Sequence, residues 1–193
     1  MSINAYAKLN AKLTRQECDG RYLKPLQKHL QGSKLAMVVG GSEKRSKTGE
    51  VQHCGIDVEL IDRKSAIPVI CDFLGKCRAP IGSSLDFNLD DAFKSYAFGD
   101  LEGLALYLID STDHACDTGD LVDQLGCALG DRCVILSKSK LQSGTAVYAY
   151  GQSFVEMQYL IHGIVASHPL CTKSRTIQIT PNRRVPPPGK RSR

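Results

Sequence analysis

The feature that most constrains the fold of this chain is a repeated order of strand-like and helix-like segments, which is clearest in the second half. Apolar runs of strand length lie at residues 103–109, 133–136, 145–150 and 175–180. Between them, apolar residues recur at helical spacing in two stretches, 117–129 and 154–167. Ser153 stands where it can cap the second stretch. The second half is therefore predicted to have the order β-α-β-β-α-β.

The first half follows the same order less regularly. Strands are predicted at residues 2–9, 35–39, 51–61 and 84–88. Gly20 and Pro25 argue against one unbroken helix over residues 14–31, so the first helix is predicted to start near Pro25. The second helix is predicted at residues 65–77. Polar loops are predicted in each half, at residues 40–50 and 137–144.

Two segments of the halves correspond, residues 56–87 and 146–179, because each runs strand, helix, proline, polar loop and short strand. We interpret this as an internal duplication, although any two strand–helix–strand units share some of the pattern. This segment order is typical of an antiparallel sheet with helices on one face. The predicted fold class is therefore α+β, with two tandem β-α-β-β-α-β (ferredoxin-like) halves.

The chain is expected to divide into two halves and a tail. The predicted first half covers residues 1–90 and the second covers residues 98–180, and residues 89–97 are a candidate for strand pairing between them. Residues 181–193 (PNRRVPPPGKRSR) are rich in proline and arginine and hold one aliphatic residue. They are expected to be a disordered basic tail because they have little apolar surface to bury.

The net charge of +5 is concentrated at the end of the chain, where five basic residues lie among the last eleven, so the remainder is neutral. A neutral body lacks the broad positive surface of a dedicated nucleic-acid-binding protein, and nucleic acid is expected to bind at most weakly, through the tail. No apolar run reaches the roughly 18 residues of a membrane span, and no signal-peptide pattern follows Lys8. A cytoplasmic protein without a membrane partner is expected.

No cluster of residues indicates a metal site, a cofactor or a catalytic centre. The eight cysteines lack the paired spacing of zinc ligands and are expected to be reduced. Cys71, Cys127 and Cys133 stand at apolar positions of their predicted elements, where free cysteine packs as a small hydrophobic residue. The alternative is a thiol nucleophile, Cys54 or Cys116 with a nearby histidine, but nothing in the sequence indicates a lowered thiol pKa. The chain is therefore predicted not to be an enzyme.

Two pairs of residues are candidates for binding a partner. Asp57 and Glu59 share the outward face of a predicted strand because they alternate with three aliphatic residues, Ile56, Val58 and Leu60. Carboxylates fixed in this way suit a basic partner. Tyr148 and Tyr150 also share one strand face, where they can stack on RNA bases, pack on the helices or lie between the halves. The predicted partner-binding residues are Asp57, Glu59, Tyr148 and Tyr150.

Three pieces of the sequence resemble patterns in small bacterial proteins of unassigned function: residues 98–108 (FGDLEGLALYL), 145–151 (TAVYAYG) and 169–171 (PLC). Some of those proteins are similar to immunity proteins of contact-dependent growth inhibition and other toxin systems. The resemblance lies mainly in the second half. It implies a cytoplasmic bacterial inhibitor that binds a cognate toxin domain, often a nuclease, and occludes its active site. The basic cleft of a nuclease would suit acidic residues.

The sequence is compatible with two other functions. The first is a regulatory or RNA-associated module of the same fold, in which the tail supplies the phosphate contacts. The second is a small enzyme with a site assembled from both halves. The fold alone does not choose among the three functions.

Overall fold

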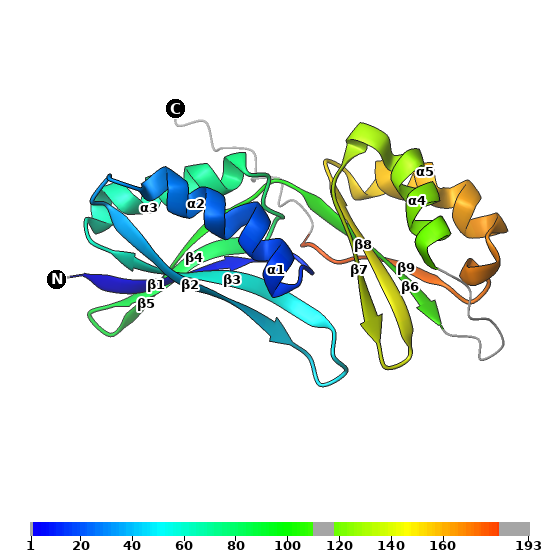
Figure 1. Cartoon of the computed structure of the whole chain (residues 1–193), viewed down its shortest axis with the longest axis horizontal. Helices are drawn as coiled ribbons and strands as arrows, with labels where there is room; N and C mark the ends of the chain where they lie inside the picture. The colour runs from blue at the N-terminus through cyan, green and yellow to red at the C-terminus, as the bar shows by residue number, and fades with distance from the viewer. Residues whose placement is uncertain (1, 110–117, 182–193) are drawn as a thin grey trace, which may run out of the picture.

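The computed structural model describes residues 2–109 and 118–181. The chain forms two antiparallel sheets, each with helices on one face (Figure 1). In each half the first four strands take the order second, third, first, fourth across the sheet. The predicted α+β class with two ferredoxin-like halves is therefore confirmed. The predicted tail, apart from Pro181, lies outside the described residues.

The first sheet has the strand order β2-β3-β1-β4-β5. Its helices all lie on one side, as Figure 1 shows. The elements of this half are β1 (Ile3–Leu9), α1 (Arg15–Cys18), the π-helical segment η1 (Asp19–Leu23), α2 (Lys24–Leu30), β2 (Ala36–Arg45), β3 (Val51–Leu60), α3 (Arg63–Lys76), β4 (Ser83–Leu89) and β5 (Ala92–Phe98).

The second sheet has the order β7-β8-β6-β9, and α4 and α5 cover the face that is turned away from the first half (Figure 1). The helix predicted at residues 154–167 is confirmed, with Ser153 as its cap. The elements of this half are β6 (Glu102–Ile109), α4 (Thr118–Leu129), the short 3-10 helix η2 (Gly130–Arg132), β7 (Cys133–Leu141), β8 (Gly144–Gly151), α5 (Phe154–Ser167), a second 3-10 helix η3 (Pro169–Cys171) and β9 (Arg175–Gln178).

α2 begins at Lys24 with Pro25 in its first turn, as predicted, but the helical path starts earlier than predicted, at residue 15. Thr14 caps α1 through a capping box with Glu17, and the helical path continues through η1 into α2. In η1 the Lys24 N–H bonds to the Asp19 carbonyl, one residue further back than in an α-helix. Proline clashes with the carbonyl four residues earlier in a regular helix. The wider turn directly before Pro25 gives the ring room.

Both predicted polar loops were largely wrong, because strand covers most of each. β2 runs through Gly40 and Gly41 to Arg45, with a β-bulge just before Gly40, and β7 takes up much of the other loop. A Cβ added to Gly41 would lie 2.8 Å from side-chain atoms of Asp19 and Leu23. The glycine therefore permits the close approach of η1 to the strand instead of ending the strand.

Residues 89–97 do not pair between the halves, contrary to the prediction. β5 forms a hairpin with β4, and the turn residues Asp90 and Asp91 have φ angles of 48° and 61°. Two consecutive residues with positive φ are typical of the type I′ turn that joins antiparallel strands. The first sheet thus extends to Phe98 and has a fifth strand at its edge.

One hydrophobic core runs through the first half and continues onto the second sheet. It fills the space between the first sheet and its helices, and from the second half it includes Ala105, Ile135, Ala146, Tyr148 and Tyr150. A separate core lies between the second sheet and α4 and α5, built around Leu106, Leu121, Leu125, Val147 and Met157. The second sheet is therefore covered on both faces. None of the described helices combines the length and apolarity needed to cross a membrane.

Candidate functional site

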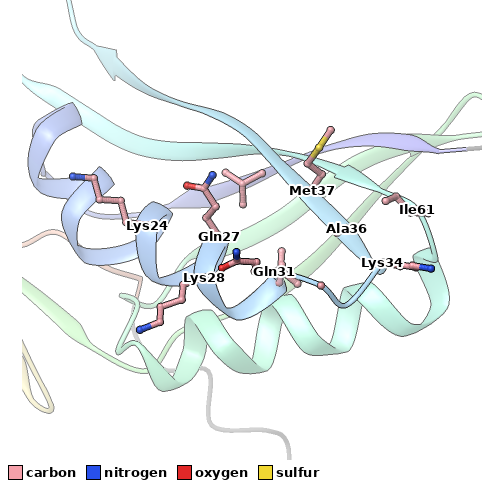
Figure 2. Close-up of a pocket in the computed structure, with 11 residues that line it drawn as sticks. Lys24, Gln27, Lys28, Gln31, Lys34, Ala36, Met37 and Ile61 are labelled. Carbon is pink, nitrogen blue, oxygen red and sulfur yellow. The ribbon is translucent and has the colours of Figure 1, made fainter.

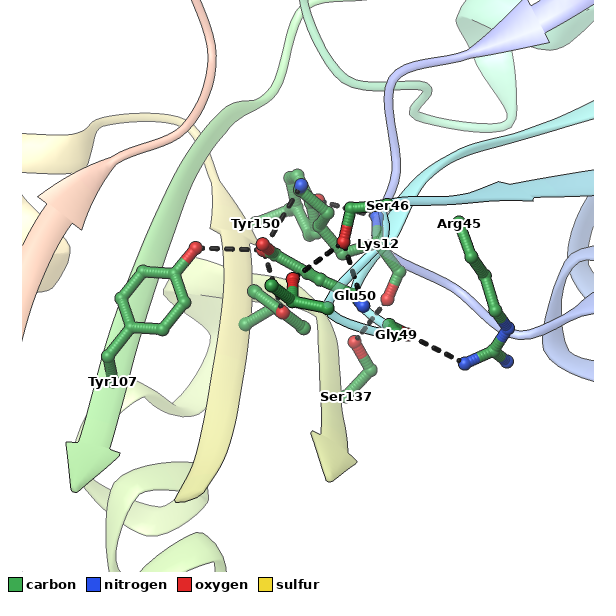
Figure 3. A network of polar contacts seen from close by, with 10 residues as sticks. Lys12, Arg45, Ser46, Gly49, Glu50, Tyr107, Ser137 and Tyr150 are labelled. Atoms are coloured by element: carbon green, nitrogen blue, oxygen red, sulfur yellow. Dashed lines mark hydrogen bonds and ion pairs between the residues drawn. The ribbon is translucent and has the colours of Figure 1, made fainter. Parts of the chain in front are cut away.

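Tyr148 and Tyr150 lie in the contact between the two halves and are fully buried. The Tyr150 hydroxyl accepts a hydrogen bond of 2.8 Å from the Lys12 N–H, and Ser137 Oγ donates one of 3.2 Å to the Lys12 carbonyl (Figure 3). A partner cannot reach either ring in this arrangement. The prediction that these tyrosines bind a partner is corrected accordingly: their aromatic surface joins the halves, which was one of the alternatives for this strand face.

Glu50 lies at the centre of this contact and was not found by sequence reasoning. Its Oε1 accepts hydrogen bonds from the hydroxyls of Tyr107 at 2.8 Å and Tyr148 at 3.0 Å, and Lys12 Nζ lies 3.2 Å away (Figure 3). Burial by itself would raise the pKa of Glu50, but the Tyr107 hydrogen bond and the Lys12 charge outweigh it and the pKa is lowered. Glu50 is therefore held as a carboxylate that links β6 and β8 to the first half.

Asp57 and Glu59 lie on the helix-free face of the first sheet, as their alternation predicted. Their aliphatic neighbours on β3 are buried beneath the helices, while Asp57 is exposed and Glu59 half-buried. Asp57 pairs across the ladder with Tyr6, and Tyr6 pairs on its other side with Asp86 of β4. The structure thus brings a third carboxylate, Asp86, onto the face. We call Asp57, Glu59 and Asp86 the acidic face.

Neither Asp57 nor Glu59 forms a salt bridge with any residue that the structure describes. Asp86 accepts a hydrogen bond of 2.6 Å from Ser95 Oγ of β5. The carboxylates therefore sit on a rigid ladder, and none of the three is paired with a cation among the described residues.

Tyr6 fixes the middle of this face. Its ring lies directly over Gly55, since a Cβ added there would overlap the ring atoms. Its hydroxyl is 3.2 Å from Ser42 Oγ, and the ring meets His53 edge-on with 6.2 Å between centroids. Burial raises the pKa of Tyr6. The ring is thus a neutral, immobile spacer beside Asp57.

The charge of the helix-free face changes from negative to positive along the strands. Lys8, Lys44 and His53 lie at the end nearer the contact between the halves, opposite the end that carries Glu59. Partial burial lowers the pKa of His53, and the charges of Lys8 and Lys44 add to the effect. His53 is therefore held towards its neutral form, and the two lysines carry the positive charge at that end.

Large apolar side chains are exposed at both edges of the acidic face. Met37 pairs with Glu59 from the edge strand β2 and is 53% exposed, and Val39 in the bulge is 63% exposed. Phe93, on the opposite edge strand β5, is 67% exposed. Exposed apolar groups beside charged ones are typical of protein-binding surfaces.

A groove of about 570 Å³ lies beside Met37, between α2 and β2 (Figure 2). Its lining includes Lys24, Lys28 and Lys34, which would suit an anion if they converged. Figure 2 shows their amino groups pointing away from one another. The groove therefore extends the apolar edge at Met37 without forming an anion site.

The described residues do not assemble the thiol chemistry that was considered. Cys54 is fully buried, and a hydrogen bond with Cys18 together with burial raises its pKa, which keeps it a thiol. His53 lies on the opposite face of the strand. Cys116 and His114 lie outside the described residues. Within the described part of the chain, no group of three or more His, Cys, Asp and Glu residues is placed to hold a metal ion.

The seven described cysteines are free thiols, and Cys18, Cys54 and Cys171 are buried. Cys127 is exposed, so its predicted place at an apolar position was wrong. The buried stripe of α4 is formed by Leu121, Leu125 and Leu129, at four-residue spacing. Cys127 falls two residues after Leu125, on the far side of the helix.

The comparisons with known proteins return little. No protein-family model and no curated protein matches the chain. Among solved structures, the chain is similar to the crystal structure of the first two RRM domains of a yeast poly(U)-binding protein, with 11% identity over 91% of this chain and 98% of that chain. The TM-score is 0.26, so the likeness carries no functional argument. What can be said of function comes from the acidic face.

Proposed function

We propose that this protein binds another protein through the acidic face and that the partner presents a basic surface there. The observation that carries the proposal is the position of Asp57, Glu59 and Asp86 on the helix-free face of the first sheet, with Met37 and Phe93 exposed at its edges. Carboxylates held on strands lose little entropy when a partner binds. Apolar side chains at the edges add the buried area that charge alone does not supply.

The same observations weigh against the RNA-associated alternative. RNA-binding sheets of this topology display aromatic side chains with basic neighbours on their central strands. The central strands of the first sheet display Asp57 and Glu59, which repel phosphate. The aromatic residues of the second sheet, Tyr148 and Tyr150, are buried against the first half. The second sheet therefore offers bases no site, and on the first sheet Tyr6 and His53, with Lys8 beside them, share their face with carboxylates that repel phosphate.

The finer form of the proposal is an inhibitor that neutralises a toxin, with a nuclease as the favoured target. It rests on the resemblance of the second half to immunity proteins. A nuclease cleft is basic because it holds phosphate, and carboxylates fixed on a sheet would compete for it. In this form the acidic face occupies the cleft and the edges contact its rim.

Charge reversal on the face tests the proposal. The double variant Asp57→Lys with Glu59→Lys should fold normally and lose the partner that purifies with the wild type, with an affinity loss of about 100-fold or more because like charges face each other. The matched control, Asp123→Lys with Asp131→Lys, makes the same charge change at exposed positions of the second half. Isothermal titration against the identified partner measures both.

Equal affinities for the two double variants would remove the acidic face from the interface. Nucleic acid as the bound species would favour the RNA-associated module instead. For the inhibitor form, the catalytic activity of the partner is measured with an equimolar amount of this protein, and undiminished activity would leave a binding protein that is not an inhibitor.

A further inference from the structure

A second cavity, on the opposite side of the first sheet from the acidic face, has the composition of a small-molecule site. It lies between α3 and the β4–β5 hairpin and has a volume of about 530 Å³. Its apolar floor is formed by Ile67, Pro68, Cys71, Phe87 and Leu89. Cavities of this size with an apolar lining and a few polar groups are typical of small-molecule sites.

The fifth strand builds the outer wall of this cavity. Lys94 and Tyr96 stand on the helix side of β5, because they pair with the inward-facing residues Phe87 and Leu85 of β4. The Tyr96 and Phe87 rings are nearly parallel, with 8° between their planes and 5.9 Å between centroids. Tyr96 is still 45% exposed, so part of its ring is free to contact a ligand. β5 thus adds an aromatic wall that the four-stranded arrangement lacks.

The charged groups of the cavity are all cationic. Arg63 and Lys64 of α3 and Lys94 of β5 line it, and no acidic residue does. Lys64 interacts with the nearby Asp62 carboxylate, whose pKa is lowered first by its capping hydrogen bond to Ser65. Arg63 and Lys94 have no ion pair with any residue of the described chain.

The floor of the cavity brings no compensating negative charge. Burial raises the pKa of Cys71 to about 11, so its thiol stays neutral near pH 7. This composition contrasts with the groove beside Met37, where the three lysines diverge and the lining contains no aromatic ring.

We propose that the cavity binds a small planar aromatic anion, an aryl carboxylate or aryl sulfonate. The ring of the ligand packs on the apolar floor and against Tyr96, and its anionic group lies between Arg63 and Lys94. Charge complementarity selects an anion, and the flat aromatic wall selects a planar hydrophobic group over inorganic phosphate. This site is independent of the acidic face and of any protein partner.

Fluorescence of 8-anilinonaphthalene-1-sulfonate, an aryl sulfonate, tests the proposal on the full chain. The wild type should bind the probe saturably with one-to-one stoichiometry, and 2-naphthoate should displace it. Two competitors should bind at least about tenfold less well than 2-naphthoate. The neutral alcohol 2-naphthalenemethanol lacks the anionic group, and inorganic phosphate lacks the aromatic ring. Equal competition by the neutral analogue, or by phosphate, would overturn the assignment.

Three variants locate the site. Arg63→Glu with Lys94→Glu should weaken binding of the probe by about tenfold or more, and Cys71→Phe should abolish it by filling the floor. The control Lys24→Glu with Lys34→Glu makes the same charge change at the groove beside Met37 and should stay within about twofold of the wild type. Melting temperatures and near-ultraviolet circular dichroism confirm that each variant is folded.

If Cys71→Phe does not fold, Tyr96→Ser on the exposed strand β5 takes its place. This variant should clearly weaken binding of the probe. An equal loss in the groove control and the Arg63/Lys94 variant would show binding to general positive charge and would overturn the site. Probe binding that is unchanged in both Tyr96→Ser and the Arg63/Lys94 variant would do the same.

Discussion

The two sheets have the same strand order, but their helix-free faces are used differently. On the first sheet this face is open and carries Asp57 and Glu59, which alternate with buried residues of β3. On the second sheet the same face packs on the first half and carries Tyr148 and Tyr150. A shared topology therefore leaves one sheet face available to a partner and makes the other part of a core. Whether a helix-free face is open or buried is decided by what packs against it, and not by the strand order of the sheet.

Truncating Tyr150 should break the contact between the halves and have the largest effect. Tyr150→Ala removes a fully buried ring and the acceptor for the Lys12 N–H, so we expect a loss of about 3–5 kcal/mol in the free energy of unfolding. The control is Tyr159→Ala at a tyrosine that is 81% exposed, where a change within about 0.5 kcal/mol is expected. Urea denaturation measures both. Similar losses at the two positions would mean that the second sheet is not covered in solution.

Glu50→Gln sharpens the comparison by keeping the shape of the contact while removing its charge. Lys12 then has no anionic partner, and the Tyr107 and Tyr148 hydroxyls lose a charged acceptor. We expect a loss of about 1–3 kcal/mol in unfolding free energy at pH 7. The double variant Glu50→Gln with Lys12→Met should recover part of it, since no charge is then left unpaired. A loss equal to the sum of the two single variants would contradict coupling between Glu50 and Lys12.

The charge on Glu50 also predicts a dependence on pH. Its folded pKa lies below the ordinary value of 4.5, so the carboxylate binds fewer protons in the folded state. The stabilisation is present above pH 4.5 and is lost as pH falls through the folded pKa. Urea midpoints of the wild type and Glu50→Gln should therefore converge as the pH is lowered from 6 to 3. A constant difference over that range would show that Glu50 is not ionised in the contact.

The smallest effect on stability is expected on the open face. Asp57→Lys with Glu59→Lys should change the unfolding free energy by no more than about 0.5 kcal/mol per site, because neither side chain has an ion pair among the described residues. Denaturant titration of the variant checks this. A loss comparable with that of Tyr150→Ala would show that the first sheet is covered on both faces as well.

Local periodicity predicted most of the elements because it reports which residues face a core. The alternation in β3 and the helical spacing in α5 both hold in the structure. The errors occur at glycine, proline and turn residues, whose effect depends on the residues packed around them. Gly41 is a strand residue that lets η1 approach, and Pro25 is accommodated by the π-helical turn before it. Asp90 and Asp91 form a tight turn, and β5 follows them within the first sheet.

The sequence by itself determined the order of the elements and the face on which Asp57 and Glu59 lie, because a period of two or of 3.6 residues is a local property of the backbone. Only the tertiary structure decided what covers each face. Glu50 meets Tyr107 and Tyr148 from 57 and 98 residues away in the chain, and no local pattern marks such a meeting. The alternation of Tyr148 and Tyr150 is compatible with an open face as well as with a buried one. Packing of the second sheet against the first half removed that ambiguity, since burying their rings withdraws a large apolar area from water.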